Sequence, residues 1–157
     1  MVHKSYHKKR GGTKTRKNKN LVSTNRSSLA EFQKQIARKF FEILLMIKLF
    51  HWKTYSYATH KATDELYGKY NDHMDKFMEI LLGKTGIRMD FTKEKTISLI
   101  DLESREKLIE KINDYKSYLV DLSSNKMMKL MTNTDLLNIR DEILGDMNQF
   151  LYLLSLK

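Results

Sequence analysis

Apolar residues recur at helical spacing in four segments of this 157-residue chain, and this periodicity restricts the fold more than any other feature. The clearest segment has apolar steps of four and three residues, which place its members on one face of a helix. These members are Leu108, Ile112, Tyr115, Leu119 and Leu122. The chain also contains no proline, the residue that helix interiors exclude most strongly. We therefore expect an all-α fold.

The apolar segments give approximate bounds for four helices. The first is predicted over residues 29–53 and the second over residues 60–82, where Gly83 ends it. The third contains the stripe described above, and the fourth begins near Asn133 or Thr134. Four helices in about 130 residues predict a four-helix bundle that forms one domain over residues 27–157.

The lengths of the connections suggest the topology of this bundle. Only a few residues join the first two helices, which predicts an antiparallel pair. About 18 residues, Gly83 to Ile100, join the second and third helices, and an extended chain of that length can span a helix of about 35 Å. One long crossover at this place is the connection of ferritin-like bundles. An up-down-up-down bundle with one oversized loop is the alternative.

Positive charge is concentrated at the N-terminus. The chain has 29 Lys and Arg residues against 19 Asp and Glu, and residues 1–26 hold nine of the cations and no acid. These nine cations are Lys4, Lys8, Lys9, Arg10, Lys14, Arg16, Lys17, Lys19 and Arg26. Because this segment is so polar, it cannot bury enough surface to fold. We therefore expect a disordered arm that ends at the Ser28–Glu31 capping box. Such an arm suits sequence-independent contact with DNA phosphates; a solubilising or targeting tail is the alternative.

Several classes of protein are excluded. The absence of cysteine excludes disulfide frameworks, zinc fingers, iron-sulfur clusters and thiol nucleophiles. The most apolar run, Phe40 to Phe50, has eleven residues, about half of what a bilayer span needs. No apolar stretch follows the N-terminal charges closely enough to form a secretory signal. We expect a cytoplasmic or nucleoid-associated protein, or one packaged in a virion.

Two pairs of metal-ligating residue types follow one another on the second helix. His60 and Asp64 are four residues apart, as are Asp75 and Glu79, so each pair shares a helix face and can hold one ion. The two pairs face the same side, but about 16 Å separates them along the axis. One chain therefore cannot bring both pairs to a single metal.

A two-fold axis near the middle of the helix solves this problem. An antiparallel second copy places His60 and Asp64 of one chain beside Asp75 and Glu79 of the other, which gives two sites per dimer. Gly68 lies near the midpoint, where a glycine allows two backbones to approach closely. His51, near the end of the first helix, is the expected additional ligand.

These residues resemble the ferroxidase motif of the Dps proteins, the DNA-binding miniferritins of starved bacteria. The His60-x3-Asp64-x10-Asp75-x3-Glu79 spacing is the same as in that family, and Trp52 directly after His51 is also a family feature. The distance from His51 to His60 is nine residues here and twelve in the family. The segment around His51 is also similar to uncharacterised proteins of phages and large DNA viruses, which suggests a viral protein.

The resemblance implies an enzyme that oxidises Fe(II) to Fe(III) with peroxide or oxygen, inside a hollow dodecamer that stores the ferric mineral. It also implies that Trp52 is a nearby oxidisable ring; a core or interface aromatic is the alternative. Imidazole and carboxylate ligands without thiolate suit iron and also admit manganese, cobalt or zinc. The catalytic and metal-binding set predicted in this way is His51, Trp52, His60, Asp64, Asp75 and Glu79.

Other interpretations remain at this point. The acidic residues of the second helix can form a solvated face, with His60 capping its start. The shorter turn after His51 can spoil that ligand and leave a DNA-condensing or virion-associated protein without catalysis. A purely structural bundle is a third possibility. His73 lies off the pattern and is expected at the surface.

Overall fold

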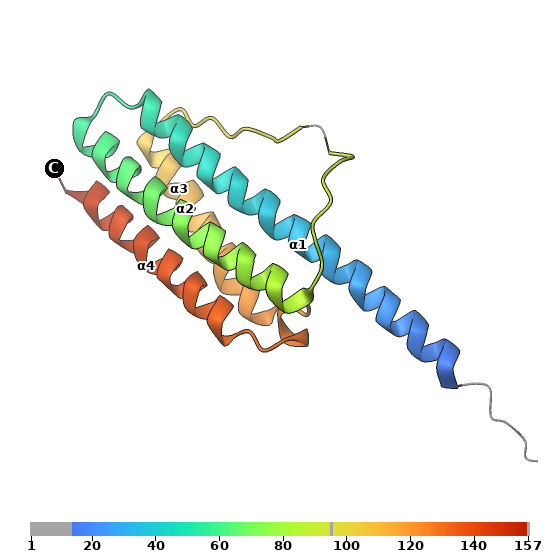
Figure 1. Cartoon of the computed structure of the whole chain (residues 1–157). Coiled ribbons are helices and arrows are strands. Elements are labelled where there is room, and N and C mark those ends of the chain that lie inside the picture. Colours follow the sequence, from blue (N-terminus) through green and yellow to red (C-terminus); the bar gives the residue numbers. More distant parts are fainter. Residues whose placement is uncertain (1–13, 95, 157) are drawn as a thin grey trace, which may run out of the picture.

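Four helices pack as a bundle in the computed structural model, which describes residues 14–94 and 96–156, and their side chains from residue 25 onward (Figure 1). The all-α prediction is therefore confirmed. The helices are α1 (Lys14–Lys53), α2 (Tyr57–Thr85), α3 (Arg105–Asp121) and α4 (Thr134–Ser155). Two short 3-10 turns, η1 (Leu122–Ser124) and η2 (Met128–Leu130), lie between α3 and α4.

The connection between α2 and α3 is the long crossover that the sequence predicts. Residues 86–94 and 96–104 lie along the bundle between the end of α2 and the start of α3, and these two helices point the same way (Figure 1). Helix α2 contacts both α1 and α4, and α4 contacts α3. The alternative of an up-down-up-down bundle is thereby excluded, because its second and third helices are antiparallel.

The core is built from the apolar stripes. Helix α1 contributes the largest share, nine of the 26 buried hydrophobic residues. At the centre, the ring of Phe40 contacts those of Tyr70 and Phe77 edge to face, with centroids 6.0 and 5.2 Å apart. All three side chains are almost completely buried. Edge-to-face packing of this kind adds to the hydrophobic gain and fixes the level of α2 against α1.

The ends of α2 differ from the sequence prediction. The helix begins at Tyr57, three residues before the predicted start, because the hydroxyl of Ser56 accepts a hydrogen bond from the Thr59 backbone N–H at 3.3 Å. Gly83 does not end it. The helix continues to Thr85, and Gly86 terminates it with φ of 63°, a left-handed conformation that glycine adopts without strain.

Helix α1 begins earlier than the sequence predicts. Ser28 lies inside the helix, whose first residue is Lys14, so the Ser28–Glu31 pattern is not the N-terminal cap. Lys and Arg are good helix formers, and neither proline nor glycine interrupts residues 14–28, so a capping pattern within the helix has no effect. The predicted domain boundary at residue 27 lies within α1. Its N-terminal end extends past the bundle (Figure 1).

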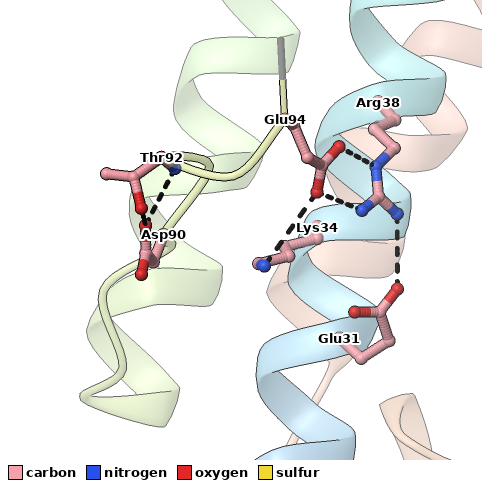
Figure 2. Close-up of polar contacts among 6 residues, drawn as sticks. All are labelled: Glu31, Lys34, Arg38, Asp90, Thr92 and Glu94. Carbon is pink, nitrogen blue, oxygen red and sulfur yellow. Dashed lines mark hydrogen bonds and ion pairs between the residues drawn. The ribbon is translucent and has the colours of Figure 1, made fainter.

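Ion pairs attach the crossover to α1. Glu94 accepts hydrogen bonds from Nε of Arg38 at 2.7 Å and from Nη2 of the same guanidinium, while Lys34 lies on its other side (Figure 2). Further along, Nζ of Lys53 donates to Asp101 at 2.8 Å. The crossover is therefore held at both ends of its path along α1. None of the described helices is long and apolar enough to cross a bilayer.

Candidate metal centre

The two histidines of the predicted site lie against one another at the turn between α1 and α2. The imidazole rings of His51 and His60 are stacked, with centroids 3.9 Å apart and planes 22° apart. His51 comes from the last turn of α1 and is buried, whereas His60 comes from the first turn of α2 and is half-buried. The short turn of residues 54–56 thus brings the two rings together.

Each histidine is held by the backbone of the other. Nδ1 of His51 lies 3.0 Å from the carbonyl oxygen of His60, and Nδ1 of His60 lies 3.1 Å from the carbonyl oxygen of His51. A carbonyl only accepts, so both Nδ1 atoms carry a proton, and the lone pair of the neutral ring is then on Nε2. A backbone carbonyl on the second nitrogen is the usual arrangement of a metal-ligating histidine.

Asp64 completes one side of the centre. Its Oδ1 lies 3.7 Å from Nε2 of His51, on the side of the ring that the backbone leaves free. About half of the carboxylate side chain is exposed, so the opening faces solvent. His51 therefore lies beside two other predicted ligands, His60 and Asp64, within a single chain.

A lysine that the sequence interpretation did not include also lies at the centre. Nζ of Lys48 is 3.8 Å from Oδ1 of Asp64 and 4.3 Å from the centroid of the Tyr67 ring. The centroid of the Trp52 ring is 5.9 Å from the same nitrogen. Lys48 is one helical turn before His51 and Trp52, and that spacing could have identified it. Trp52 is 70% exposed, so the alternative of a core aromatic is excluded.

The second predicted pair does not reach this centre within one chain. Asp75 and Glu79 are exposed on α2, one and two turns beyond Asn71, on the same outer side of the helix as Asp64. Among the described residues, no group of three or more histidine, aspartate and glutamate side chains within one chain is able to hold a metal ion.

The middle of α2 offers room for that approach. A Cβ atom placed on Gly68 would meet no other atom within 4 Å, and the neighbouring Asn71 is exposed. This glycine is therefore not required by packing within the chain. A mid-helix glycine costs about 1 kcal/mol relative to alanine, so an external reason is expected for its presence.

His73 differs from the prediction of a surface residue. Its ring is half-buried between α2 and α4, where Nε2 lies 2.9 Å from Asp146 and Nδ1 lies 3.4 Å from Glu142. These contacts tie two neighbouring helices together. The sequence could not show them, because residues 73 and 146 are distant along the chain.

The structure describes the side chain of only one of the nine predicted DNA-binding residues. Lys4, Lys8, Lys9 and Arg10 lie outside the described residues, as do the side chains of Lys14, Arg16, Lys17 and Lys19, whose backbone belongs to α1. Arg26 is exposed on α1.

Comparison with known proteins gives a family but no activity. A family model described as a family of unknown function (DUF5856) matches residues 51–154, from the first histidine of the candidate centre almost to the end of α4. No curated protein and no solved structure matches the chain.

Proposed function

We infer the function from the residues of this chain, because it belongs to DUF5856, a family whose function is unknown. We propose that two copies pair about a two-fold axis and build two metal sites between them. In each site, His51, His60 and Asp64 come from one copy, and Asp75 and Glu79 from the other. The substrate is Fe(II), which is oxidised to Fe(III).

The stacked histidines are the single observation that carries this proposal. The ring of His60 is stacked on that of His51, and Asp64 lies beside Nε2 of His51. Two imidazoles held by backbone hydrogen bonds suit a first-row divalent metal, and carboxylates suit the harder ferric product. The short turn of residues 54–56 supports His51 as a ligand, since it stacks His51 on His60.

The chemistry needs few protein groups. Each Fe(II) gives up one electron, and one peroxide molecule takes two electrons and two protons to become two water molecules. Because each ion has few protein ligands, positions remain for water or the oxidant. The exposed carboxylates on the outer side of α2 lower the energy of an approaching cation, and Trp52 is an oxidisable ring next to His51.

The cationic N-terminus supports a second role. Nine positive charges in residues 1–26 suit DNA binding without sequence preference, and the body of the protein has 20 basic against 19 acidic residues. The same feature favours the alternative function, a DNA-condensing or virion-associated protein without catalysis. Replacing the nine cations by glutamine separates these roles from metal binding: we expect DNA retardation in gels to disappear and metal binding to persist.

Metal binding by the native chain and by an Asp75→Asn, Glu79→Gln variant tests the main proposal. Titration with Co(II), monitored through the visible absorption of the ion, measures the replacement of water by protein ligands and involves no redox chemistry. We expect one ion per chain in the native protein and at least tenfold weaker binding in the variant. Aerobic Fe(II) oxidation should slow in parallel.

Asp72→Asn combined with Glu103→Gln is the matched control. It removes two exposed acids, one of them on the same helix, and leaves the proposed ligands in place. Its titration should equal that of the native protein. Equal Co(II) binding and equal oxidation rates in the native protein and in the Asp75→Asn, Glu79→Gln variant would eliminate the proposal.

A further inference from the structure

Helix α1 carries an apolar stripe on the side that faces away from the bundle core. Phe41 is 40% exposed, Leu45 and Leu49 are half-buried, and Trp52 is 70% exposed. Steps of four, four and three residues keep these side chains on one face. Arg38 extends the stripe by a further three residues. A contiguous apolar surface of this kind commonly marks an interaction site.

The stripe is symmetric about Leu45. Arg38 and Trp52 lie seven residues on either side, about 10.5 Å along the axis, and Phe41 and Leu49 lie four residues on either side. If two copies of α1 cross antiparallel at Leu45, each Phe41 faces a Leu49 and each Trp52 faces an Arg38. A two-fold interface requires this self-complementarity.

The centre of the stripe is level with the centre of the metal-ligand pairs on α2. His60 with Asp64 and Asp75 with Glu79 are symmetric about the bond between Lys69 and Tyr70. Nearby, Tyr70 packs on Phe40, and Tyr67 lies under the Lys48 ammonium group. Tyr70 and Tyr67 of α2 thus contact Phe40 and Lys48 of α1, which lie on either side of Leu45. One two-fold axis therefore serves both helices.

We propose that a second copy of this chain docks on this stripe, with its Trp52 seated on Arg38 of the first copy. The inference rests on the proposed function, because the same axis brings the two halves of each metal site together. It adds a surface and an anchor: the tryptophan next to the metal ligand His51 of one copy also holds that copy to its partner. Assembly of the interface and assembly of the metal site are then coupled.

A hollow is available for the incoming indole ring. Arg38 and Phe41 form one wall of a cavity of about 490 Å³ between α1 and the crossover, and Phe91, Glu94 and Ile97 form the other. The guanidinium of Arg38 is fixed by Glu94 and Glu31 (Figure 2). A fixed guanidinium beside apolar side chains is a favourable seat for a tryptophan face, through cation–π attraction and burial.

Trp52 is the single tryptophan of the chain, so its fluorescence tests the proposal directly. In the native protein, raising the concentration from the monomer to the dimer range should shift the emission to shorter wavelength and reduce acrylamide quenching several-fold. Leu45→Arg places two positive charges at the axis, where they face each other. This variant should stay monomeric at every concentration, and acrylamide should quench its Trp52 fluorescence as strongly as in the dilute native protein.

Val120→Arg is the matched control, since Val120 is an exposed apolar residue on α3, which carries no part of the stripe. It should dimerise as the native protein does. Circular dichroism shows whether both variants remain folded. Arg38→Gln removes the seat of Trp52 and leaves the apolar stripe intact. The dimer dissociation constant should rise at least tenfold, while the monomer keeps its helicity.

The outcomes separate this inference from the proposed function. A dimer with protected Trp52 that binds no Co(II) supports the docking surface and removes the metal site. A dimer that binds Co(II) while Trp52 stays as quenched as in the monomer overturns the docking surface and leaves the metal site. A native chain that is monomeric at every concentration overturns both.

Discussion

Lys48 places a positive charge beside the carboxylate that a metal ion needs. Its ammonium group lies 3.8 Å from Oδ1 of Asp64 and is held above the Tyr67 ring. A cation that approaches Asp64 therefore has to compete with Lys48. This residue lowers metal affinity, and its removal should raise it.

Substitution Lys48→Met should strengthen Co(II) binding by about two- to fivefold, the value of an exposed ion pair of up to about 1 kcal/mol. Methionine keeps most of the apolar length over Tyr67. Calorimetric titration measures the change, and Lys61→Met, at an exposed lysine on α2, is the control that should leave binding as it was. Weaker binding by the Lys48→Met protein would show that Lys48 supports the centre rather than opposing it.

For the individual residues of the candidate site, the sequence predicted the types of ligand but not the contacts between them. The spacing of His60, Asp64, Asp75 and Glu79 follows from the 3.6-residue helical period, so their common side could be read directly. The stacking of His51 on His60 depends on a three-residue turn whose path no periodicity describes. Lys48 was not predicted as part of the site because lysine is not a usual metal ligand, although it lies one helical turn from His51.

The end of α3 depends on a buried arginine from α4. Arg140 is 8% exposed, and its Nη1 donates to the Ser123 hydroxyl at 2.6 Å and to the Leu119 carbonyl at 3.4 Å. Its Nε lies 2.7 Å from Oδ1 of the exposed Asp141. A positive charge at a helix C-terminus binds the carbonyls that the helix leaves free.

Substitution Arg140→Met should lower the free energy of unfolding by about 2 kcal/mol, because it removes two hydrogen bonds from a buried charged side chain. Urea denaturation followed by circular dichroism gives the value. Asp141→Asn serves as the control, with an expected loss below about 0.5 kcal/mol, because its ion pair is largely in solvent. Equal losses in both variants would place the stabilisation in the surface ion pair.

The crossover should loosen at acidic pH. Hydrogen bonds from Arg38 hold the pKa of the Glu94 carboxyl below its usual value. A lowered pKa in the folded state contributes stability above the unfolded value of about 4.3, and the contribution is lost as the pH falls through the folded value. Below about pH 4, hydrogen exchange in residues 88–101 should quicken before the helices unfold. Glu94→Gln should show the fast exchange already at pH 7, with the global stability little changed.

Element boundaries illustrate why local signals are incomplete. Both Gly83 and Gly86 can end a helix by their residue type. Of the two, only Gly86 adopts a positive φ, and the helix ends there. Leu81 is buried and Leu82 half-buried, and the hydrogen bond from Gly86 N–H to the Leu82 carbonyl closes the last turn. The crossover, in contrast, was suggested by the length of the connection between the second and third helices, although length alone left an up-down-up-down bundle open.

Across the whole molecule, a group of tyrosines inside the bundle makes the fold sensitive to alkali. Burial, with a contribution from the Glu42 charge, raises the pKa of Tyr118 to about 12. Burial and a hydrogen bond to Glu42 raise the pKa of Tyr115, and burial raises that of Tyr70. A raised pKa in the folded state contributes stability below the unfolded value of about 10, which is lost as the pH rises through the folded value.

Stability should therefore fall steadily between pH 10 and about pH 12. Tyr118→Phe should flatten this fall by about 1–2 kcal/mol, which urea midpoints across the range would show. Tyr152→Phe makes the same chemical change at a tyrosine that is 63% exposed, and it should keep the native pH profile. An unchanged slope in the Tyr118→Phe protein would rule out this tyrosine as a source of the alkaline sensitivity.

The central claim concerns two molecules: each metal site takes residues from both. Two defective chains test it by complementation. The first carries His60→Ala and Asp64→Asn, the second carries Asp75→Asn and Glu79→Gln, and a homodimer of either has both sites broken. A mixed dimer has one site with all its ligands and one with neither half.

Co(II) binding by the two variants, alone and after joint refolding at equal concentration, is the most direct measurement. We predict negligible binding by either variant alone and about a quarter of the native number of sites in the mixture, since half of the dimers are mixed and each regains one of two sites. A mixture that binds no better than its parents would contradict a site shared between two copies.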